Sequence, residues 1–188
     1  MLPPTELFFQ AVRSLNAEAV YAATEKETSA LVKDVVLRSG ALSVAVGGIP
    51  NPVRESVLSA LVGVKVVEPE RMGNRDAKEA LSGSDLGITW AKNGIVKEGA
   101  LLEVTWDDAV KLTSCLPMSH LALLSEKSLL PDFAAGMREA GRMVAASPLP
   151  KPTVSFIAGP SKTADIESRL LYGVHGPHSL TVGVLGWI

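Results

Sequence analysis

Thr153–Leu185 reads T-V-S-F-I-A-G-P-S-K-T-A-D-I-E-S-R-L-L-Y-G-V-H-G-P-H-S-L-T-V-G-V-L, and the fold that we expect is built around it. Two apolar runs rich in β-forming residues, Val154–Ala158 and Leu180–Leu185, enclose a turn, a stretch with helical spacing and a second turn. This is the spacing of one β-loop-α-loop-β unit. Gly173 suits the left-handed position just past the end of the expected helix. We therefore predict two strands joined by a helix at this end of the chain.

The first loop of this stretch gathers groups that can hold an anion. Gly159 ends the strand, and Ser161, Lys162 and Thr163 add two hydroxyls and one cation just before the expected helix. Backbone amides at a helix start, together with hydroxyls and an ammonium, favour a bound carboxylate or phosphate. The alternative is that the hydroxyls cap the helix while Lys162 is solvated. The loop is not a Walker loop, and the chain has no G-x-G-x-x-G dinucleotide motif.

Three further polar residues follow the loop. Asp165 and Glu167 fall in the first turn of the expected helix, and His175 comes after it. They would form an acid–base or metal cluster only if the second loop folds back, and residues two apart on a helix point in different directions. Carboxylates in a first turn are also favoured by the helix dipole. We keep Asp165, Glu167 and His175 as candidate ligand contacts, with capping or packing roles as the alternative; we expect no metal, and we assign no catalytic residue.

G-P-S-K-T-A-D-I-E, followed by G-V-H-G-P and a terminal apolar strand, resembles the closing signature of the lactate-utilization protein C family, whose members carry the LUD domain. The resemblance is ungapped from Ile157 to Pro177 and weakens toward the N-terminal third. It implies a fold like that of the sugar-phosphate isomerase and CoA-transferase group, a three-layer α/β/α sandwich on a mainly parallel sheet. It also implies that Gly176, in the second loop, contacts the ligand.

The resemblance extends to two positions in the middle of the chain. L-P-M-S-H, which ends at His120 before an apolar strand, is similar to the family's L-P-x-x-H. His120 is therefore a candidate ligand contact, with a structural hydrogen-bonding histidine as the alternative, because position alone does not tune a histidine's pKa.

The family's Thr-Gly-Thr turn is matched only in part. Gly99 is present, but Lys97 occupies the usual acidic position, and Glu98 and Ala100 replace the hydroxyl residues. Hydroxyl contacts at this turn are therefore not carried over. Glu98 is either a substitute carboxylate near the ligand or an exposed turn residue.

The rest of the chain alternates short apolar strands with helical patterns, which is typical of right-handed crossovers and a mostly parallel sheet. Thr24 and Glu27 match a capping box whose helix should stop near Gly40. A helical pattern over Leu129–Val144 precedes the closing stretch. Glu68–Asp76, which contains two arginines, is expected to be a mobile surface loop rather than a phosphate clamp.

Ligands of open α/β sheets bind beyond the carboxyl ends of the strands. Three glycine-bearing loops, Gly47-Gly48, Gly94–Gly99 and Gly159–Thr163, follow predicted strands. We therefore expect these loops to share one cleft.

The composition narrows the class of protein. A chain of 188 residues fits one domain, so we treat residues 1–188 as a single LUD-type α/β domain. Eighteen basic and twenty acidic residues give a net charge of −2 without a basic block, which disfavours nucleic acid as a partner. Although 47% of the residues are apolar, no run is long enough to span a membrane, and we expect the surplus in the buried sheet and in a homo-oligomer interface.

The N-terminal residues bear on the location of the protein, and the cysteine count bears on its disulfides and metal clusters. M-L-P-P-T-E-L-F-F-Q lacks a basic region and a cleavage site, so we expect a cytoplasmic location. Cys115 is the only cysteine, which excludes an internal disulfide and an iron–sulfur cluster ligated by cysteines of this chain alone.

The resemblance implies that the chain is the cluster-free subunit of an L-lactate utilization system that oxidises lactate to pyruvate together with iron–sulfur partner proteins. The alternative is a stand-alone enzyme that binds a small anion such as an acyl-CoA, a folate or a sugar phosphate, like other proteins of the CoA-transferase, sugar-phosphate isomerase and folate cyclo-ligase fold. That alternative rests on fold analogy. A purely structural interaction module is the third interpretation. No cofactor is expected on this chain, and whether it is itself an enzyme is left open.

Overall fold

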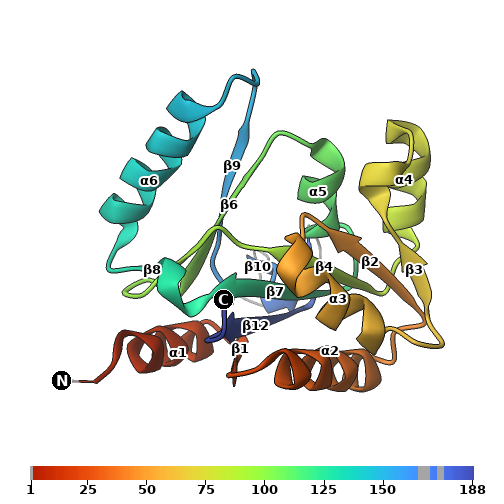
Figure 1. Cartoon of the computed structure of the whole chain (residues 1–188), viewed down its shortest axis with the longest axis horizontal. Coiled ribbons are helices and arrows are strands. Elements are labelled where there is room, and N and C mark those ends of the chain that lie inside the picture. The colour runs from red at the N-terminus through yellow and green to blue at the C-terminus, as the bar shows by residue number, and fades with distance from the viewer. Residues whose placement is uncertain (1, 165–169, 173–175) are drawn as a thin grey trace.

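The computed structural model describes residues 2–164, 170–172 and 176–188. Its centre is a six-stranded sheet in which every neighbouring pair is parallel (Figure 1). The strand order is β1-β12-β7-β4-β2-β3, and the bounds are β1 Glu18–Ala22, β2 Ser43–Gly47, β3 Lys65–Val67, β4 Leu86–Trp90, β7 Ser119–Ser125 and β12 Ser179–Leu185. The expected α/β class with a mainly parallel sheet is confirmed.

The closing strand β12 lies inside this sheet, between β1 and β7. Every residue of β12 after Ser179 is buried. Leu180, Val182 and Val184 contribute to the core on one face of the sheet, and Leu185 contributes to the core on the other face. Strands covered on both faces need such continuous apolar runs, which explains why this stretch of sequence is so apolar.

Helices α2 (Glu25–Ser39) and α3 (Asn51–Ala60) cover one face of the sheet (Figure 1). The start of α2 follows the expected capping box, because Thr24 Oγ1 accepts from the Glu27 amide at 3.1 Å. The Glu27 carboxylate accepts from the amide of Ala23, one residue before the cap, at 2.7 Å. Gly40 ends the helix in the left-handed conformation. The predicted bounds of this helix are confirmed.

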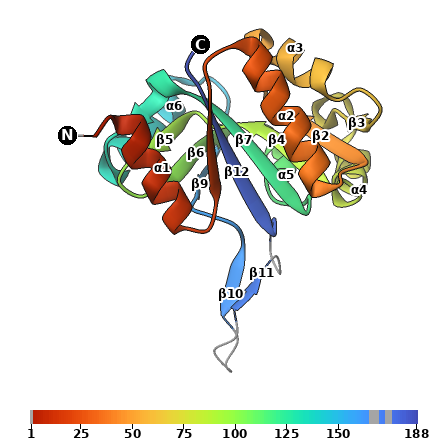
Figure 2. The same ribbon diagram turned by 90° about the horizontal axis from the view of Figure 1, so that it is seen from below.

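The opposite face is covered by the helices α1 (Pro4–Ser14), α4 (Asn74–Ser82) and α5 (Asp108–Thr113) and by a second sheet (Figure 2). The segment Glu68–Asp76 lies largely at the surface, as expected, but it is not a loop throughout, because α4 begins at Asn74. Pro69–Arg71 forms a short 3-10 helix, and Glu68 forms ion pairs with Arg54 and Arg71. Arg71 is therefore paired with a carboxylate, as a solvated surface charge would be.

The second sheet was not expected from the sequence. Its order is β8-β5-β6-β9, with β5 Asn93–Ile95, β6 Ala100–Thr105, β8 Leu129–Leu130 and β9 Thr153–Ile157. Helix α6 (Phe133–Ala146) packs on it through Ala140, and α6 begins later than predicted because Asp132 caps it by accepting from the Ala135 amide at 2.8 Å.

The predicted β-loop-α-loop-β unit is not formed. The strand expected at Val154–Ala158 exists as β9, but it runs antiparallel to β6 in the second sheet. The end of the expected helix is also wrong, because Leu170–Tyr172 forms the strand β11, which pairs antiparallel with β10 (Lys162–Ala164), and both strands project from the body (Figure 2). Residues 165–169, where that helix was expected to begin, lie outside the described residues. Helical spacing over so few residues is a weak signal, since a short helix depends on tertiary packing for its stability.

Candidate functional site

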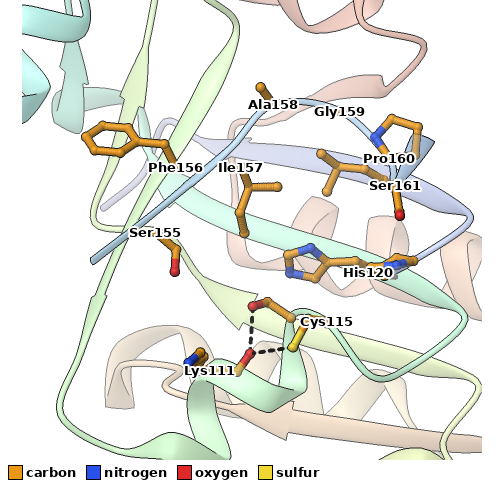
Figure 3. A pocket seen from close by; sticks show the side chains of 14 residues that line it. Lys111, Cys115, His120, Ser155, Phe156, Ile157, Ala158, Gly159, Pro160 and Ser161 are labelled. Carbon is orange, nitrogen blue, oxygen red and sulfur yellow. Dashed lines mark hydrogen bonds between the residues drawn. The ribbon is translucent and has the colours of Figure 1, made fainter. Parts of the chain in front are cut away.

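A cavity of about 330 Å³ lies between the two sheets and the loop after β9 (Figure 3). Its volume falls at the lower end of the range of small-molecule sites, roughly 300–1,000 Å³. The lining residues are Lys111, Ser114 and Cys115 from α5 and the turn after it, His120 and Leu180 from the main sheet, Ser155–Ile157 from β9, and Ala158–Ser161 and Gly176–Pro177 from the loops at the base of the hairpin.

The cavity lies at the amino ends of the parallel strands, not at the expected carboxyl ends. His120 and Leu180 are the second residues of β7 and β12, and they are partners in the sheet register. The loop after β9 arrives at this edge because β9 belongs to the second sheet. Of the three glycine-bearing loops expected to share a cleft, only the one at Gly159 lines this cavity. Gly48 lies outside it, and a Cβ added at Gly48 would lie 2.9 Å from Val110 Cγ1.

Three buried polar side chains form a hydrogen-bonded chain that reaches the cavity at His120. His120 Nε2 lies 2.8 Å from Thr89 Oγ1, and Thr89 Oγ1 donates to Glu103 Oε1 at 2.7 Å. The three residues come from β7, β4 and β6, so the chain connects the two sheets. Gly87, which is paired with His120, lets α5 approach closely, since a Cβ there would lie 2.0 Å from the Thr113 carbonyl oxygen.

Burial shifts the pKa of both titratable members of this chain. It lowers the pKa of His120 to about 4, so the imidazole is neutral at pH 7. Burial raises the pKa of Glu103, and hydrogen bonds from Thr89 and Ser114 act in the opposite direction. A neutral histidine carries one donor and one acceptor nitrogen, so His120 can offer either kind of group to a ligand.

Cys115 and Lys111 lie on the wall of the cavity opposite the loop (Figure 3). The Cys115 thiol donates to the Lys111 carbonyl oxygen at 3.4 Å. Burial raises the pKa of this thiol, although the Lys111 charge lowers it. The thiol is therefore protonated at neutral pH, which disfavours a role as a nucleophile. Lys111 supplies a positive charge near the cavity.

The loop expected to hold an anion contributes in part. Gly159 and Ser161 line the cavity, and the Ser161 amide donates to the Pro177 carbonyl oxygen at 2.9 Å. Lys162 does not line it, and its ammonium donates to the Leu15 carbonyl oxygen at the end of α1 at 3.0 Å. Lys162 and Thr163 belong to the strand β10, and residues 165–169, where the helix was expected to begin, lie outside the described residues.

The remaining predicted site residues divide into three groups. Gly176 lines the cavity. Glu98 and Gly99 lie in the β5–β6 turn outside it, where Gly99, with φ +62°, approaches the backbone of α1 too closely for a Cβ. One Glu98 oxygen, Oε2, is buried without a hydrogen-bond partner in the described part of the chain. Asp165, Glu167 and His175 lie outside the described residues.

Sequence reasoning missed Glu103, Thr89 and Lys111. The signal for Glu103 was present, because it is a charged residue in the otherwise apolar run A-L-L-E-V-T of β6. A carboxylate on a strand buried on both faces needs a polar partner, and this points to a site. Thr89 and Lys111 carry no comparable signal, since threonines in strands and lysines on short helices are ordinary.

Two kinds of feature are absent from the described ranges 2–164, 170–172 and 176–188. There, no group of three or more His, Cys, Asp or Glu side chains is placed to hold a metal ion. No helix in these ranges is long and apolar enough to cross a bilayer.

The chain is similar in sequence to a known domain family and to several proteins of known name. The sequence profile of the LUD domain matches residues 5–185. Lactate utilization protein C from Anoxybacillus flavithermus is 32% identical over 111 residues, which cover 59% of this chain and 48% of that protein. Lactate utilization protein C from Halalkalibacterium halodurans is 32% identical over 94 residues, or 50% of this chain and 41% of that protein. The matches thus span about half the length of these relatives.

A crystal structure of a DUF162 family protein from Deinococcus radiodurans has the same fold. It superposes with a TM-score of 0.66 and 20% sequence identity, and the alignment covers 99% of this chain and 100% of that one. Because the LUD domain profile matches nearly the whole chain, the protein belongs to the LUD domain family.

Proposed function

We propose that this chain takes part in lactate utilization, as the cluster-free component that binds the hydroxy acid while iron–sulfur partner proteins take up the electrons. Oxidation of lactate to pyruvate releases two electrons and two protons, and both must pass to other groups. Cys115 is the only cysteine of this chain, and one cysteine cannot ligate an iron–sulfur cluster. The relatives named lactate utilization protein C support the lactate part of the proposal.

The observation that carries the proposal is the set of groups around one cavity. Lys111 offers a cation, Ser155 and Ser161 offer hydroxyls, and His120 offers a neutral ring. A small carboxylic acid with a hydroxyl group complements this set, because the cation attracts the carboxylate and the ring and hydroxyls hydrogen-bond the hydroxyl.

Deletion in the native host tests this proposal. We expect the deletion strain to grow normally on glucose and poorly on L-lactate, and a plasmid with the wild-type gene to restore growth. The His120→Gln gene, expressed at the same level, should restore it only weakly. A tagged chain should co-purify with proteins that contain iron and acid-labile sulfide. Normal growth of the deletion strain on L-lactate, without such partners in the purified sample, would overturn the proposal.

A second candidate is a stand-alone enzyme acting on another small anion. The Glu103–Thr89–His120 chain favours it, because enzymes position a proton-accepting ring in this way. The melting temperature separates the two candidates, since a ligand that binds the folded state stabilises it by mass action. Stabilisation by an acyl-CoA, a folate or a sugar phosphate, and none by L-lactate, would favour the enzyme.

A further inference from the structure

The hydrogen bonds among Glu103, Thr89 and His120 all run in one direction, and this fixes which nitrogen of His120 carries a proton. A threonine hydroxyl has a single proton, and Thr89 Oγ1 donates it to the Glu103 carboxylate at 2.7 Å. The contact of 2.8 Å between Thr89 Oγ1 and His120 Nε2 is then a hydrogen bond only if Nε2 carries the proton. A neutral imidazole has one N–H, so Nδ1 of His120 bears a lone pair.

The second ring nitrogen of His120, Nδ1, remains available to a ligand. Thr89, Glu103 and His120 are 1%, 6% and 2% exposed, so the chain is closed to bulk water. Among the described residues, Nδ1 has no hydrogen-bond partner, and the His120 ring lines the cavity (Figure 3). The cavity therefore meets His120 at its acceptor nitrogen.

We propose that Glu103 is a positioning residue: acting through Thr89, its carboxylate fixes the proton of His120 on Nε2, so that Nδ1 accepts a hydrogen bond from a ligand hydroxyl in the cavity. The ligand part of this statement rests on the proposed function. The tautomer part does not.

The surroundings of Glu103 fit this role. The titratable groups that face it are His120 from the main sheet and Cys115 after α5, whose pKa is raised in part by the Glu103 charge. Ser155 is its partner on β9. Lys111, at the same cavity, is the cation available to a bound carboxylate. Among the described residues no cation forms an ion pair with Glu103. A buried carboxylate of this kind is costly, and such groups are found most often at functional sites.

The ligand class follows from the acceptor nitrogen. A 2-hydroxy acid can place its carboxylate toward Lys111 and donate its hydroxyl proton to His120 Nδ1. A 2-oxo acid has the same carboxylate but no proton to donate, so its carbonyl oxygen would face a lone pair. The site therefore discriminates the hydroxyl from the carbonyl compound.

Nitrogen NMR of the ring measures the tautomer directly. The chain has three histidines, so a ¹⁵N-histidine sample gives few signals, and His120→Gln identifies those of His120. At pH 8 we expect Nε2 to be the protonated nitrogen and Nδ1 the unprotonated one. Thr89→Val and Glu103→Met should both lose this fixed tautomer and move the two nitrogens toward averaged shifts. Thr181→Val, the same change at another buried threonine, should leave the shifts unchanged.

Two results would overturn the positioning role: Nδ1 protonated in the wild type, or an unchanged tautomer in folded Thr89→Val. The isosteric Thr89→Val keeps the test decisive if Glu103→Met does not fold.

Calorimetry with L-lactate and pyruvate tests the ligand part. We expect L-lactate to bind about tenfold more tightly than pyruvate, which is the ratio that one hydrogen bond supplies, and Thr89→Val to reduce this ratio to about one. Equal affinities in the wild type would overturn the discrimination. If neither acid binds while the tautomer is as expected, the lactate function fails and Glu103 keeps its positioning role.

Discussion

At the scale of single residues, His120 has the clearest physical signature. It is a polar ring with 2% exposure, and burial favours its neutral form. Its pKa in the folded chain is about 4, and in an unfolded chain it would be near its ordinary value of 6.5. The difference between the two states makes the free energy of unfolding depend on pH.

Acidification should destabilise the protein through His120. Between pH 7 and pH 5 the unfolded chain binds a proton that the folded chain does not, so this residue alone should lower the free energy of unfolding by up to about 2 kcal/mol. Glu103 acts in the opposite sense, because its raised pKa lets the folded state bind a proton first. The difference between wild type and His120→Gln in urea unfolding at both pH values isolates the histidine. Identical pH dependence of the two proteins would contradict the prediction.

Gly159 is a second residue whose identity is set by geometry. Its φ is +81°, and a Cβ there would lie 2.7 Å from the Leu15 carbonyl oxygen. We expect Gly159→Ala to lower the free energy of unfolding by about 1–3 kcal/mol. A Cβ added at Gly141, within α6, would meet no atom within 4 Å, so Gly141→Ala should raise it by up to about 1 kcal/mol. Thermal or urea unfolding should show that Gly159→Ala is less stable than the wild type and Gly141→Ala more stable. A change of the same sign and size in both variants would contradict this account.

At the scale of elements, α5 organises the site. The helix has six residues, and Asp107 caps it by accepting from the Ala109 amide at 2.8 Å. It sits against the main sheet because Gly47 and Gly87 leave room for Thr113, where any Cβ would collide. This close approach places Lys111 and Cys115 at the cavity.

Two lysines now compete for the role of anion-binding cation. Lys111 lines the cavity, whereas Lys162 donates to the end of α1, where a cation is favoured by the helix dipole. We expect Lys111→Met to weaken L-lactate binding about tenfold or more, since a charge-assisted contact contributes about 1.5–3 kcal/mol. Lys162→Met should change the affinity less than about twofold. Calorimetry at matched salt compares them, and the reverse order of effects would return Lys162 to the site.

Single helices and strands were easier to predict from the sequence than the pairing of strands into sheets. The run of β12 and the cap of α2 depend on residues close in sequence, and both were predicted correctly. The second sheet depends on β6 pairing with β9 some fifty residues later, and an apolar strand such as Val154–Ala158 does not specify which sheet it joins. Because β9 joins the second sheet, the loop after it lies at the amino ends of the main-sheet strands, and so does the cavity that this loop lines. His120 was found through its motif, while its partner Thr89 becomes visible only in three dimensions.

At the scale of the whole molecule, the two sheets share one core. Helix α1 lies against both of them (Figure 2), and Phe8, which has 0% exposure, packs with Leu101 of the second sheet and Val182 of the main sheet. A Cβ at Gly94 would lie 2.9 Å from the Phe8 ring. Because this shared core cannot be opened from one side alone, we propose that residues 1–188 unfold as one domain.

Removal of the Phe8 ring should weaken both sheets at once. We expect Phe8→Ala to lower the free energy of unfolding by about 3–5 kcal/mol, whereas Leu7→Ala, one position along the same helix but 39% exposed, should cost about 1 kcal/mol or less. Trp106 packs on the core of the second sheet and Trp187 on that of the main sheet. The third tryptophan, Trp90, packs on the main-sheet core, so variants that keep only Trp106 or only Trp187, with Trp90 replaced in both, report on each sheet separately. Their urea midpoints should coincide, and Phe8→Ala should shift both equally. If the Trp106 signal changed before the Trp187 signal, the sheets would be separate folding units, and the cavity between them would lie at a domain boundary.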